Sequence, residues 1–229
     1  MMTEPLLVLE GLTRRYGGIS AITELSLTID AGSISAVIGP AGAGKTTLVD
    51  LIAGACRPDQ GGIRFAGRDL TGLGPDRTCI AGIARTFHPP RPFPGLNVLD
   101  SVMIPALLRE PGPAEARRLA LDIRELLGLR RLAGQPAASL TLAQSKRLEL
   151  ARAVATRPRL LVLDQILTEL SEAELTRVQD VLLSLNRRPG LTLLLVEPRL
   201  DTVRALADRV VLLEHGHIIT EAAADDLPE

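Results

Sequence analysis

The segment at residues 39–47, GPAGAGKTT, constrains the fold of this chain more than any other feature. It has the spacing of a phosphate-binding loop: a glycine, four residues, then Gly-Lys-Thr. An apolar run precedes it at 34–38 and a helical pattern follows at 46–53, so we expect a strand, the loop and a helix in that order. This arrangement is typical of a site for nucleotide phosphates.

Each residue type in the loop suits a contact with a nucleotide. Three glycines let the backbone turn its N–H groups inward to form an anion nest: Gly39, Gly42 and Gly44. We expect Lys45 to meet the β- and γ-phosphates, Thr46 to offer its hydroxyl to a phosphate-bound Mg²⁺, and Thr47 to hydrogen-bond the α-phosphate. The alternative is a glycine-rich turn with an incidental lysine.

Composition excludes several other classes of function. The net charge is −1 and aromatic residues make up only 2% of the 229 residues, so neither an electrostatic footprint for nucleic acid nor base-stacking platforms are expected. Cys56 and Cys79 lack metal-ligand spacing. No apolar run approaches the roughly 20 residues of a membrane helix, and residues 1–7 lack the pattern of a signal peptide. We expect a soluble chain, or one attached to a membrane through other subunits.

Before the phosphate-binding loop, residues 6–9 and 21–29 alternate as strands do. Tyr16, the only tyrosine, lies between them in an expected loop. It would either stack on a nucleobase or pack at a sheet edge. After the loop, His-Pro-Pro-Arg-Pro-Phe-Pro-Gly at 88–95 excludes regular helix and central strand and indicates a hinge.

The hinge divides the chain into an expected core and an insertion. Helical signals dominate from 99 to 132, so we expect a single domain, 1–229, whose core at 1–87 and 158–229 carries a helical subdomain at 88–157.

A second strand–loop motif lies at residues 160–164, an apolar run that ends in Asp164. Such a run predicts a strand buried on both faces. A terminal Asp of this kind beside a phosphate-binding loop is the Walker B pattern, and we expect it to hold the Mg²⁺ shell through water. A capping box at 171–174 predicts the next helix. We then expect a strand at 191–196, a short helix near 200–207, and strands at 210–213 and 218–219.

In this order the elements resemble the ATP-binding subunits of ABC transporters, and more narrowly those of branched-chain amino-acid importers. Residues 14–18 look like the adenine-stacking loop, 82–87 are similar to the segment before the glutamine loop, and 146–152 resemble the helix after the signature sequence. The resemblance favours stacking by Tyr16. It implies an α/β fold: a P-loop NTPase core with a mixed, largely parallel sheet, an antiparallel N-terminal β-subdomain and an inserted helical subdomain.

The resemblance also implies cofactors and partners. ATP and Mg²⁺ would bind between this chain's phosphate-binding loop and the signature sequence of a homologous ATP-binding subunit, in a head-to-tail homo- or heterodimer. Transmembrane permease subunits would hold the pair at the cytoplasmic, inner face of the plasma membrane. Nucleic acid is not an expected partner.

The sequence departs from the family at two positions of the hydrolytic machinery. Gln165 stands where the family has the acidic general base, and an amide can orient water but cannot take its proton; a positioned base contributes roughly 10²–10⁴ in rate. Pro198 stands at the switch-histidine position and has neither imidazole nor backbone N–H. His215, in a later strand-Glu-His pattern, is the less favoured substitute; we interpret it as a turn histidine.

Two further motifs are altered. His88 replaces the glutamine of the glutamine loop but keeps some hydrogen-bonding capacity. The signature sequence reads Leu-Thr-Leu-Ala-Gln at 140–144: Thr141 keeps a hydroxyl and Gln144 is retained, whereas Ala143 adds a Cβ where glycine allows close approach to the partner's γ-phosphate.

The leading hypothesis is therefore an ABC importer subunit, for branched-chain amino acids or similar small polar solutes, that binds Mg-ATP with weak or absent hydrolysis. The alternatives are a soluble nucleotide-sensing protein of the same fold and an ordinary active ATPase.

Overall fold

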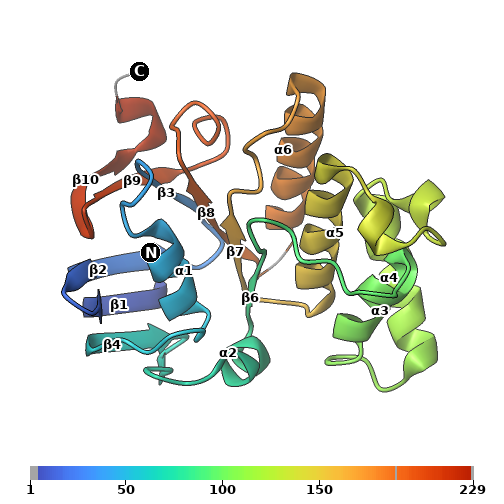
Figure 1. Cartoon of the computed structure of the whole chain (residues 1–229), viewed down its shortest axis with the longest axis horizontal. Coiled ribbons are helices and arrows are strands. Elements are labelled where there is room, and N and C mark those ends of the chain that lie inside the picture. The colour runs from blue at the N-terminus through green and yellow to red at the C-terminus, as the bar shows by residue number, and fades with distance from the viewer. Residues whose placement is uncertain (1–4, 189, 228–229) are drawn as a thin grey trace.

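A six-stranded sheet forms the centre of the molecule (Figure 1). The computed structural model describes residues 5–188 and 190–227. The strands lie in the order β10-β9-β3-β8-β7-β6, and only β10 is antiparallel to its neighbour. Their bounds are β3 Ile34–Ile38, β6 Ile83–Arg85, β7 Leu160–Asp164, β8 Thr192–Glu197, β9 Arg209–Glu214 and β10 His217–Ala223. Every residue of β3, β7 and β8 is buried, as the uninterrupted apolar runs predict.

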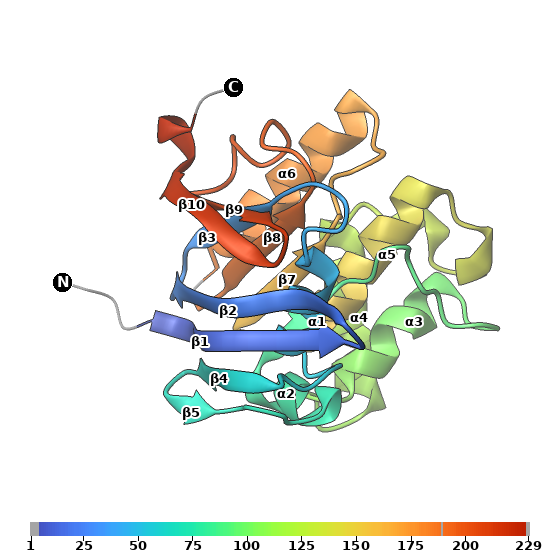
Figure 2. The ribbon, with the colours of Figure 1, turned by 60° about the vertical axis from the view of Figure 1, so that its left-hand side comes forward.

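A second, antiparallel sheet lies over one face of the first (Figure 2). Its order is β2-β1-β4-β5, with bounds β1 Pro5–Tyr16, β2 Ile19–Asp30, β4 Gln60–Phe65 and β5 Arg68–Asp69. Helix α1, Lys45–Ile52, is packed between the sheets in one apolar cluster. The helix that follows the phosphate-binding loop is thus fixed on both sides.

The remaining helices cover the opposite face of the six-stranded sheet or its edge (Figure 1). They are α2 Pro75–Ala81, α3 Val98–Ala106, α4 Pro113–Leu126, α5 Leu142–Ala155 and α6 Glu172–Asn186, with three short 3₁₀ turns at Arg130–Leu132, Ala137–Ser139 and Ala224–Asp226. Helices α3, α4 and α5 pack on one another. Within the described part of the chain, none of these helices is long and apolar enough to cross a bilayer.

Local signals set several helix ends. The predicted capping box at 171–174 is confirmed, because the Glu174 carboxylate accepts hydrogen bonds from the backbone N–H and the hydroxyl of Ser171, at 3.2 and 2.7 Å. Pro113 opens α4, where its missing N–H has no cost.

The helix predicted near 200–207 is wrong. This segment forms successive turns, in which hydrogen bonds from the backbone converge on the carbonyls of Leu200 and Val203. The Thr202 hydroxyl donates to the Arg199 carbonyl at 2.8 Å, and Arg199 pairs with Asp201. Such local side-chain bonds compete with a helical ladder.

Two other local predictions need correction. Tyr16 does not lie in a loop: it is the last residue of β1 and pairs with Ile19 of β2 across the turn. Helix α2 and strand β6 were not predicted, because at seven and three residues they are too short for a periodic pattern.

Because β7 lies inside the sheet, its side chains should contribute heavily to stability. Leu161 is completely buried, so Leu161→Ala should lower the free energy of unfolding by about 3 kcal/mol. Leu107, which is 43% exposed after α3, is the control, and Leu107→Ala should cost less than about 1 kcal/mol. Denaturant titration measures both; equal losses would contradict the assigned core.

Candidate nucleotide site

The parallel register brings three chain segments to one edge of the sheet. Ile38, the last residue of β3, pairs with Glu197, the last residue of β8. Asp164, the last residue of β7, pairs with Val196. The loops that follow these strands therefore leave the sheet side by side, at the edge where open α/β sheets bind ligands.

The loop between β3 and α1 presents backbone donors. Within the described residues, the backbone N–H groups at these positions have no protein acceptor: Gly42, Gly44, Lys45, Thr46 and Thr47. They belong to a glycine-rich loop and the first turn of a helix, where aligned N–H groups attract anions. These N–H groups are the donors that the expected anion nest would use.

Lys45 lies inside this loop. Its ammonium donates to the carbonyls of Gly39 and Pro40, at 2.7 Å each, and the residue is only 7% exposed. Burial lowers the pKa of Lys45, and the negative charges of Asp164 and Glu197 oppose that shift. The positive charge of Lys45 therefore lies where nucleotide phosphates would meet the backbone N–H groups.

Two positions in the loop tolerate only glycine. Gly44 has φ +103°, and a Cβ there would lie 2.4 Å from the Ala21 carbonyl oxygen. A Cβ on Gly39 would lie 2.0 Å from the Leu213 carbonyl oxygen. The loop is thus wedged against β2 and β9 as well as the helix, and a side chain at either position would displace it.

Asp164 carries an unsatisfied oxygen. The residue is 3% exposed, and its backbone N–H donates to the Thr86 hydroxyl at 3.0 Å. Its Oδ1 is buried without a hydrogen-bond partner among the described residues, which is costly for a carboxylate. Burial raises the pKa of Asp164, while the charges of Arg85 and His88 oppose the shift. An oxygen of this kind fits the water shell of a Mg²⁺ ion bound by Thr46.

Arg85 is a site residue that sequence reasoning missed. Its guanidinium pairs with Asp50 of α1 and lies 3.7 Å from Oδ2 of Asp164. It also lies over the ring of Phe87, 4.7 Å from the centroid. Arg85 lies in the segment 82–87 that precedes the position of the glutamine loop. The sequence of this segment did not indicate that Arg85 would lie between two carboxylates.

The residues at the altered hydrolytic positions lie around Asp164. Gln165 follows it with φ +48°, and its side-chain amide makes no hydrogen bond within the described residues. His88 is close enough for its charge to act on the pKa of Asp164, and its Nδ1 is buried without a partner in the described chain. Pro198 follows Glu197 at the end of β8. His215 is in the β9–β10 turn with 87% of its side chain exposed.

Two buried ionisable residues, Lys146 and Glu197, make hydrogen bonds to the backbone of the loop after Asp164. The Lys146 ammonium of α5 donates to the Gln165 carbonyl at 2.9 Å and to the Thr168 carbonyl. Glu197 accepts the backbone N–H of Leu167 at 2.8 Å. Lys146 is 2% exposed and Glu197 is completely buried. Neither residue was predicted, because charged residues on a helix or a strand end usually face solvent.

Tyr16 lies on the surface of the antiparallel sheet, with 47% of the residue exposed. The Arg14 guanidinium lies 4.6 Å from its ring centroid, and Ile19, its partner across the turn, is 75% exposed. An exposed aromatic ring beside an exposed aliphatic side chain forms an apolar platform suited to a nucleobase. Ile19 was missed because a single isoleucine at a strand end carries no signal.

The signature-like residues are not joined to the phosphate-binding loop. Thr141 caps α5: its hydroxyl accepts the Gln144 N–H at 3.3 Å, and the Gln144 side chain accepts the Thr141 N–H at 3.0 Å. Ala143 is 8% exposed. Within the described residues, no hydrogen bond joins 141–144 to 39–47.

The family model for ABC transporters matches residues 22–168, from β2 past Asp164. The chain belongs to the ABC transporter family. The matched stretch holds the phosphate-binding loop, the Walker B aspartate and α5, so the ABC ATP-binding domain accounts for the site described above. Its fold is that of an ABC cassette, as the sequence predicted.

Similar curated proteins include several import ATP-binding proteins. The high-affinity branched-chain amino acid transport ATP-binding protein LivG of Salmonella typhimurium is 30% identical, over 99% of this chain and 94% of LivG. The ribose import ATP-binding protein RbsA 1 of Mesorhizobium japonicum is 33% identical, and the methionine import ATP-binding protein MetN of Rhizobium etli is 35% identical. The chain spans 43% of that RbsA and 61% of that MetN.

Solved structures agree with the fold. MJ1267, an ATP-binding cassette of an ABC transporter, has a TM-score of 0.89 at 28% identity, covering 98% of this chain and 94% of MJ1267. The crystal structure of its ADP conformation gives a TM-score of 0.86. The dimeric structure of the bacterial cassette MJ0796 gives 0.88 at 25% identity, covering 95% of this chain and 98% of MJ0796.

The buried Glu197 should make stability depend on pH. Burial raises its pKa from 4.5 to about 7, so the folded protein binds a proton that the unfolded chain releases. The free energy of unfolding should therefore decrease as pH rises from 4.5 to about 7, by up to about 3 kcal/mol, and then level off. Denaturant titrations at pH 5, 6, 7 and 8 measure this change.

In Glu197→Gln, this decrease in the free energy of unfolding with pH should disappear. The stability of the variant relative to wild type should therefore increase as pH rises. Glu10→Gln, which alters an exposed carboxylate on β1, is the control. A pH dependence of Glu197→Gln that matches wild type would contradict the burial of Glu197.

Proposed function

We propose that this protein is the ATP-binding component of an ABC importer for branched-chain amino acids or similar small polar solutes, and that it binds Mg-ATP without efficient hydrolysis at its own site. One contrast carries the proposal: the groups that bind phosphate come from the backbone and Lys45 and are intact, whereas the side chains at 165 and 198 lack the required chemistry. The importer class follows from similarity to LivG over nearly its full length.

Binding uses contacts that do not require a base. The free N–H groups of Gly42 and of 44–47, with the Lys45 ammonium, receive the phosphates, and Tyr16 with Ile19 receives the adenine. Thr46 and the unsatisfied Oδ1 of Asp164 would hold Mg²⁺, which neutralises phosphate charge.

Hydrolysis requires a group that removes a proton from the attacking water. Gln165 follows Asp164 where that group belongs, and its amide can orient water by hydrogen bonds only. At Pro198 no imidazole or N–H is available to contact the γ-phosphate. His88 retains a ring nitrogen near Asp164 and can hold a water. The residues at 165 and 198 nevertheless leave the chemical step without its base.

The site is completed by a second ATP-binding chain in a head-to-tail dimer. Thr141 and the free backbone N–H groups of Leu142 and Ala143 begin α5, so they can meet the partner's nucleotide phosphate. The Ala143 Cβ weakens that contact. We infer that the partner in the transporter is a homologous subunit with an active site of its own, so that one site performs turnover. The dimeric structure of the cassette MJ0796 supports the pairing of two ATP-binding chains.

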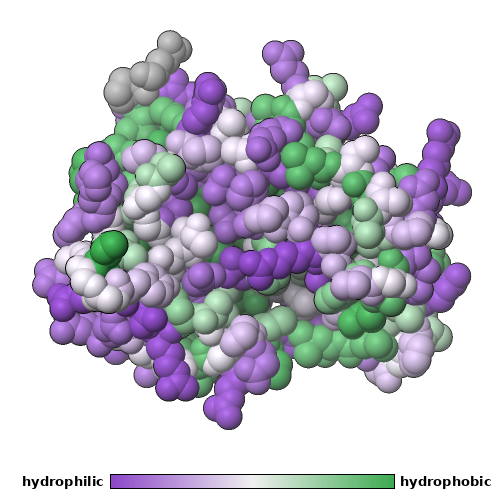
Figure 3. Space-filling model, viewed as in Figure 1, coloured by the Kyte–Doolittle hydropathy of each residue, from purple (hydrophilic) through white to green (hydrophobic). Residues whose placement is uncertain are grey.

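A groove beside the hinge is suited to the permease subunits. It has a volume of about 440 Å³ and is lined by Cys79 of α2, Phe87, Ile104 of α3 and Arg152 of α5. Exposed apolar residues belong to α2 and to the end of α3: Ile80, Ile104, Leu107 and Leu108. Figure 3 shows hydrophobic surface at the lower right, where α3 lies in Figure 1.

The hinge segment is fixed to this groove. The Arg91 N–H donates to the Glu149 carboxylate of α5 at 2.9 Å, and Arg152 donates to the Arg91 carbonyl at 2.6 Å. We therefore propose that 88–157 form the helical subdomain and that 1–87 and 158–229 form the core. Contact between the permease and this groove would hold the protein at the cytoplasmic face of the membrane.

Nucleotide binding and turnover should be separable in the purified protein. Wild type should bind Mg-ATP, measured by isothermal titration, but release phosphate at no more than about one hundredth of the rate of Gln165→Glu/Pro198→His, because a positioned base contributes roughly 10²–10⁴. Lys45→Ala should weaken ATP binding, which shows that the phosphate-binding loop is used. Glu10→Gln is the control for both assays.

A wild-type rate equal to that of the double variant would contradict impaired hydrolysis. Loss of ATP binding in wild type would contradict the proposed function as a whole.

A further inference from the structure

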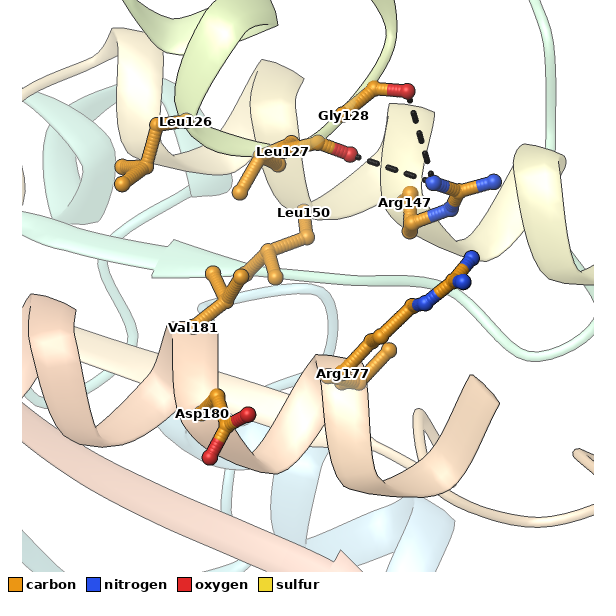
Figure 4. A pocket seen from close by; sticks show the side chains of 9 residues that line it. Leu126, Leu127, Gly128, Arg147, Leu150, Arg177, Asp180 and Val181 are labelled. Carbon is orange, nitrogen blue, oxygen red and sulfur yellow. Dashed lines mark hydrogen bonds between the residues drawn. The ribbon is translucent and has the colours of Figure 1, made fainter. Parts of the chain in front are cut away.

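A cavity of about 190 Å³ lies between α4, α5 and α6, away from the nucleotide site (Figure 4). The C-terminal end of α4 and the middle turns of α5 and α6 line it, and none of these residues belongs to the phosphate-binding loop or to the loops after β7 and β8. Its volume equals that of about six water molecules in the liquid, which matches a ligand of about six or seven non-hydrogen atoms.

Two arginines lie together at one end of this cavity. Figure 4 shows the guanidiniums of Arg147 and Arg177 pointing toward the same space, Arg147 from α5 and Arg177 from α6. Neither guanidinium has a carboxylate oxygen within 4.0 Å in the part of the chain that the structure describes. Two adjacent cations repel each other, so an anion between them would be stabilised.

The surrounding groups leave these arginines available. Arg147 donates through Nη1 to the carbonyls of Leu127 and Gly128, both at 3.4 Å, which are long hydrogen bonds. The charge of Glu174 acts on Arg147, but its carboxylate is already bound to the Ser171 N–H and hydroxyl. Burial and the charge of Arg177 both lower the pKa of Arg147, as expected for a half-buried cation beside a like charge.

The other end of the cavity is aliphatic. Side chains from each of the three helices form it: Leu126, Leu127, Leu150, Val178 and Val181. Asp180 lines the same end and is separated from the guanidiniums in Figure 4. The cavity is therefore cationic at one end and apolar at the other, with a carboxylate that disfavours a second negative group at the apolar end.

We propose that this cavity binds a small aliphatic monocarboxylate, with its carboxylate between Arg147 and Arg177 and its alkyl group among the leucines and valines. Bidentate contact with guanidinium matches a carboxylate, and the volume excludes a long acyl chain. A free α-amino group would stand beside two cations, so the acid binds in preference to the corresponding amino acid.

Such a ligand would connect α5 to α6. Thr141, at the start of α5, lies in the signature-like sequence, and α6 follows the loop after Asp164. Binding would hold these two helices together and so couple the level of a carboxylate to the part of the chain that faces a partner's nucleotide. This inference does not depend on whether the protein hydrolyses ATP.

The direct test is isothermal titration calorimetry, in which the 229-residue protein is titrated with 3-methylbutanoate at constant ionic strength. We expect one saturable site with a dissociation constant of about 0.1–1 mM. Acetate, which lacks the branched alkyl group, and 3-methylbutan-1-ol, which lacks the charge, should each bind at least about tenfold more weakly. Saturating Mg-ATP should not compete with 3-methylbutanoate for the cavity, because the nucleotide site is separate.

Substitutions assign the site. Arg177 is exposed, so Arg177→Gln should fold normally while weakening 3-methylbutanoate about tenfold or more, the cost of one charge-assisted contact. Arg187→Gln, at the C-cap position just after α6 and outside the cavity, is the matched control and should bind as wild type does. Val181→Phe should block the aliphatic end. Absence of saturable binding below 20 mM (about twenty times the weakest expected constant), equal binding of the alcohol, or wild-type affinity in Arg177→Gln would overturn the proposal.

Discussion

The parallel register of β3, β7 and β8 determines where the nucleotide site lies. Because Ile38 pairs with Glu197 and Asp164 pairs with Val196, three loops leave the sheet at one edge. The phosphate-binding loop, Gln165 and Pro198 are adjacent for this reason alone, although more than a hundred residues separate the first from the others in sequence. The antiparallel sheet then holds α1 from the other side, which fixes the helix N-terminus that faces the ligand.

Under the proposed function, phosphate binding depends on backbone groups, whereas hydrolysis depends on side chains. Phosphate binding depends on N–H groups that any sequence with the right glycines provides, and the buried Lys146 and Glu197 hold the backbone after Asp164 without using the side chain of Gln165. Under the proposed function, Gln165 and Pro198 would therefore remove chemistry without displacing the loops that carry them.

The sequence predicted the parts of the site that depend on local pattern. The Gly-Lys-Thr spacing, the apolar run before Asp164 and the capping box at 171–174 each determine structure within one turn or strand. It did not predict Arg85, Lys146 or Glu197, because their roles arise from contacts between segments distant in sequence, such as Arg85 with both Asp50 and Asp164. The turns at 200–207 were mistaken for a helix for a different reason: local side-chain hydrogen bonds outweighed the apolar spacing.

The central claim is that nucleotide binding persists where the chemical step has lost its base. A single-turnover measurement tests it most directly: excess purified protein is mixed with a substoichiometric amount of γ-labelled ATP and Mg²⁺, quenched over an hour and analysed for bound ATP and released phosphate. The account predicts that nearly all label is protein-bound and remains ATP throughout. Conversion of the bound ATP to ADP and phosphate within seconds would contradict it.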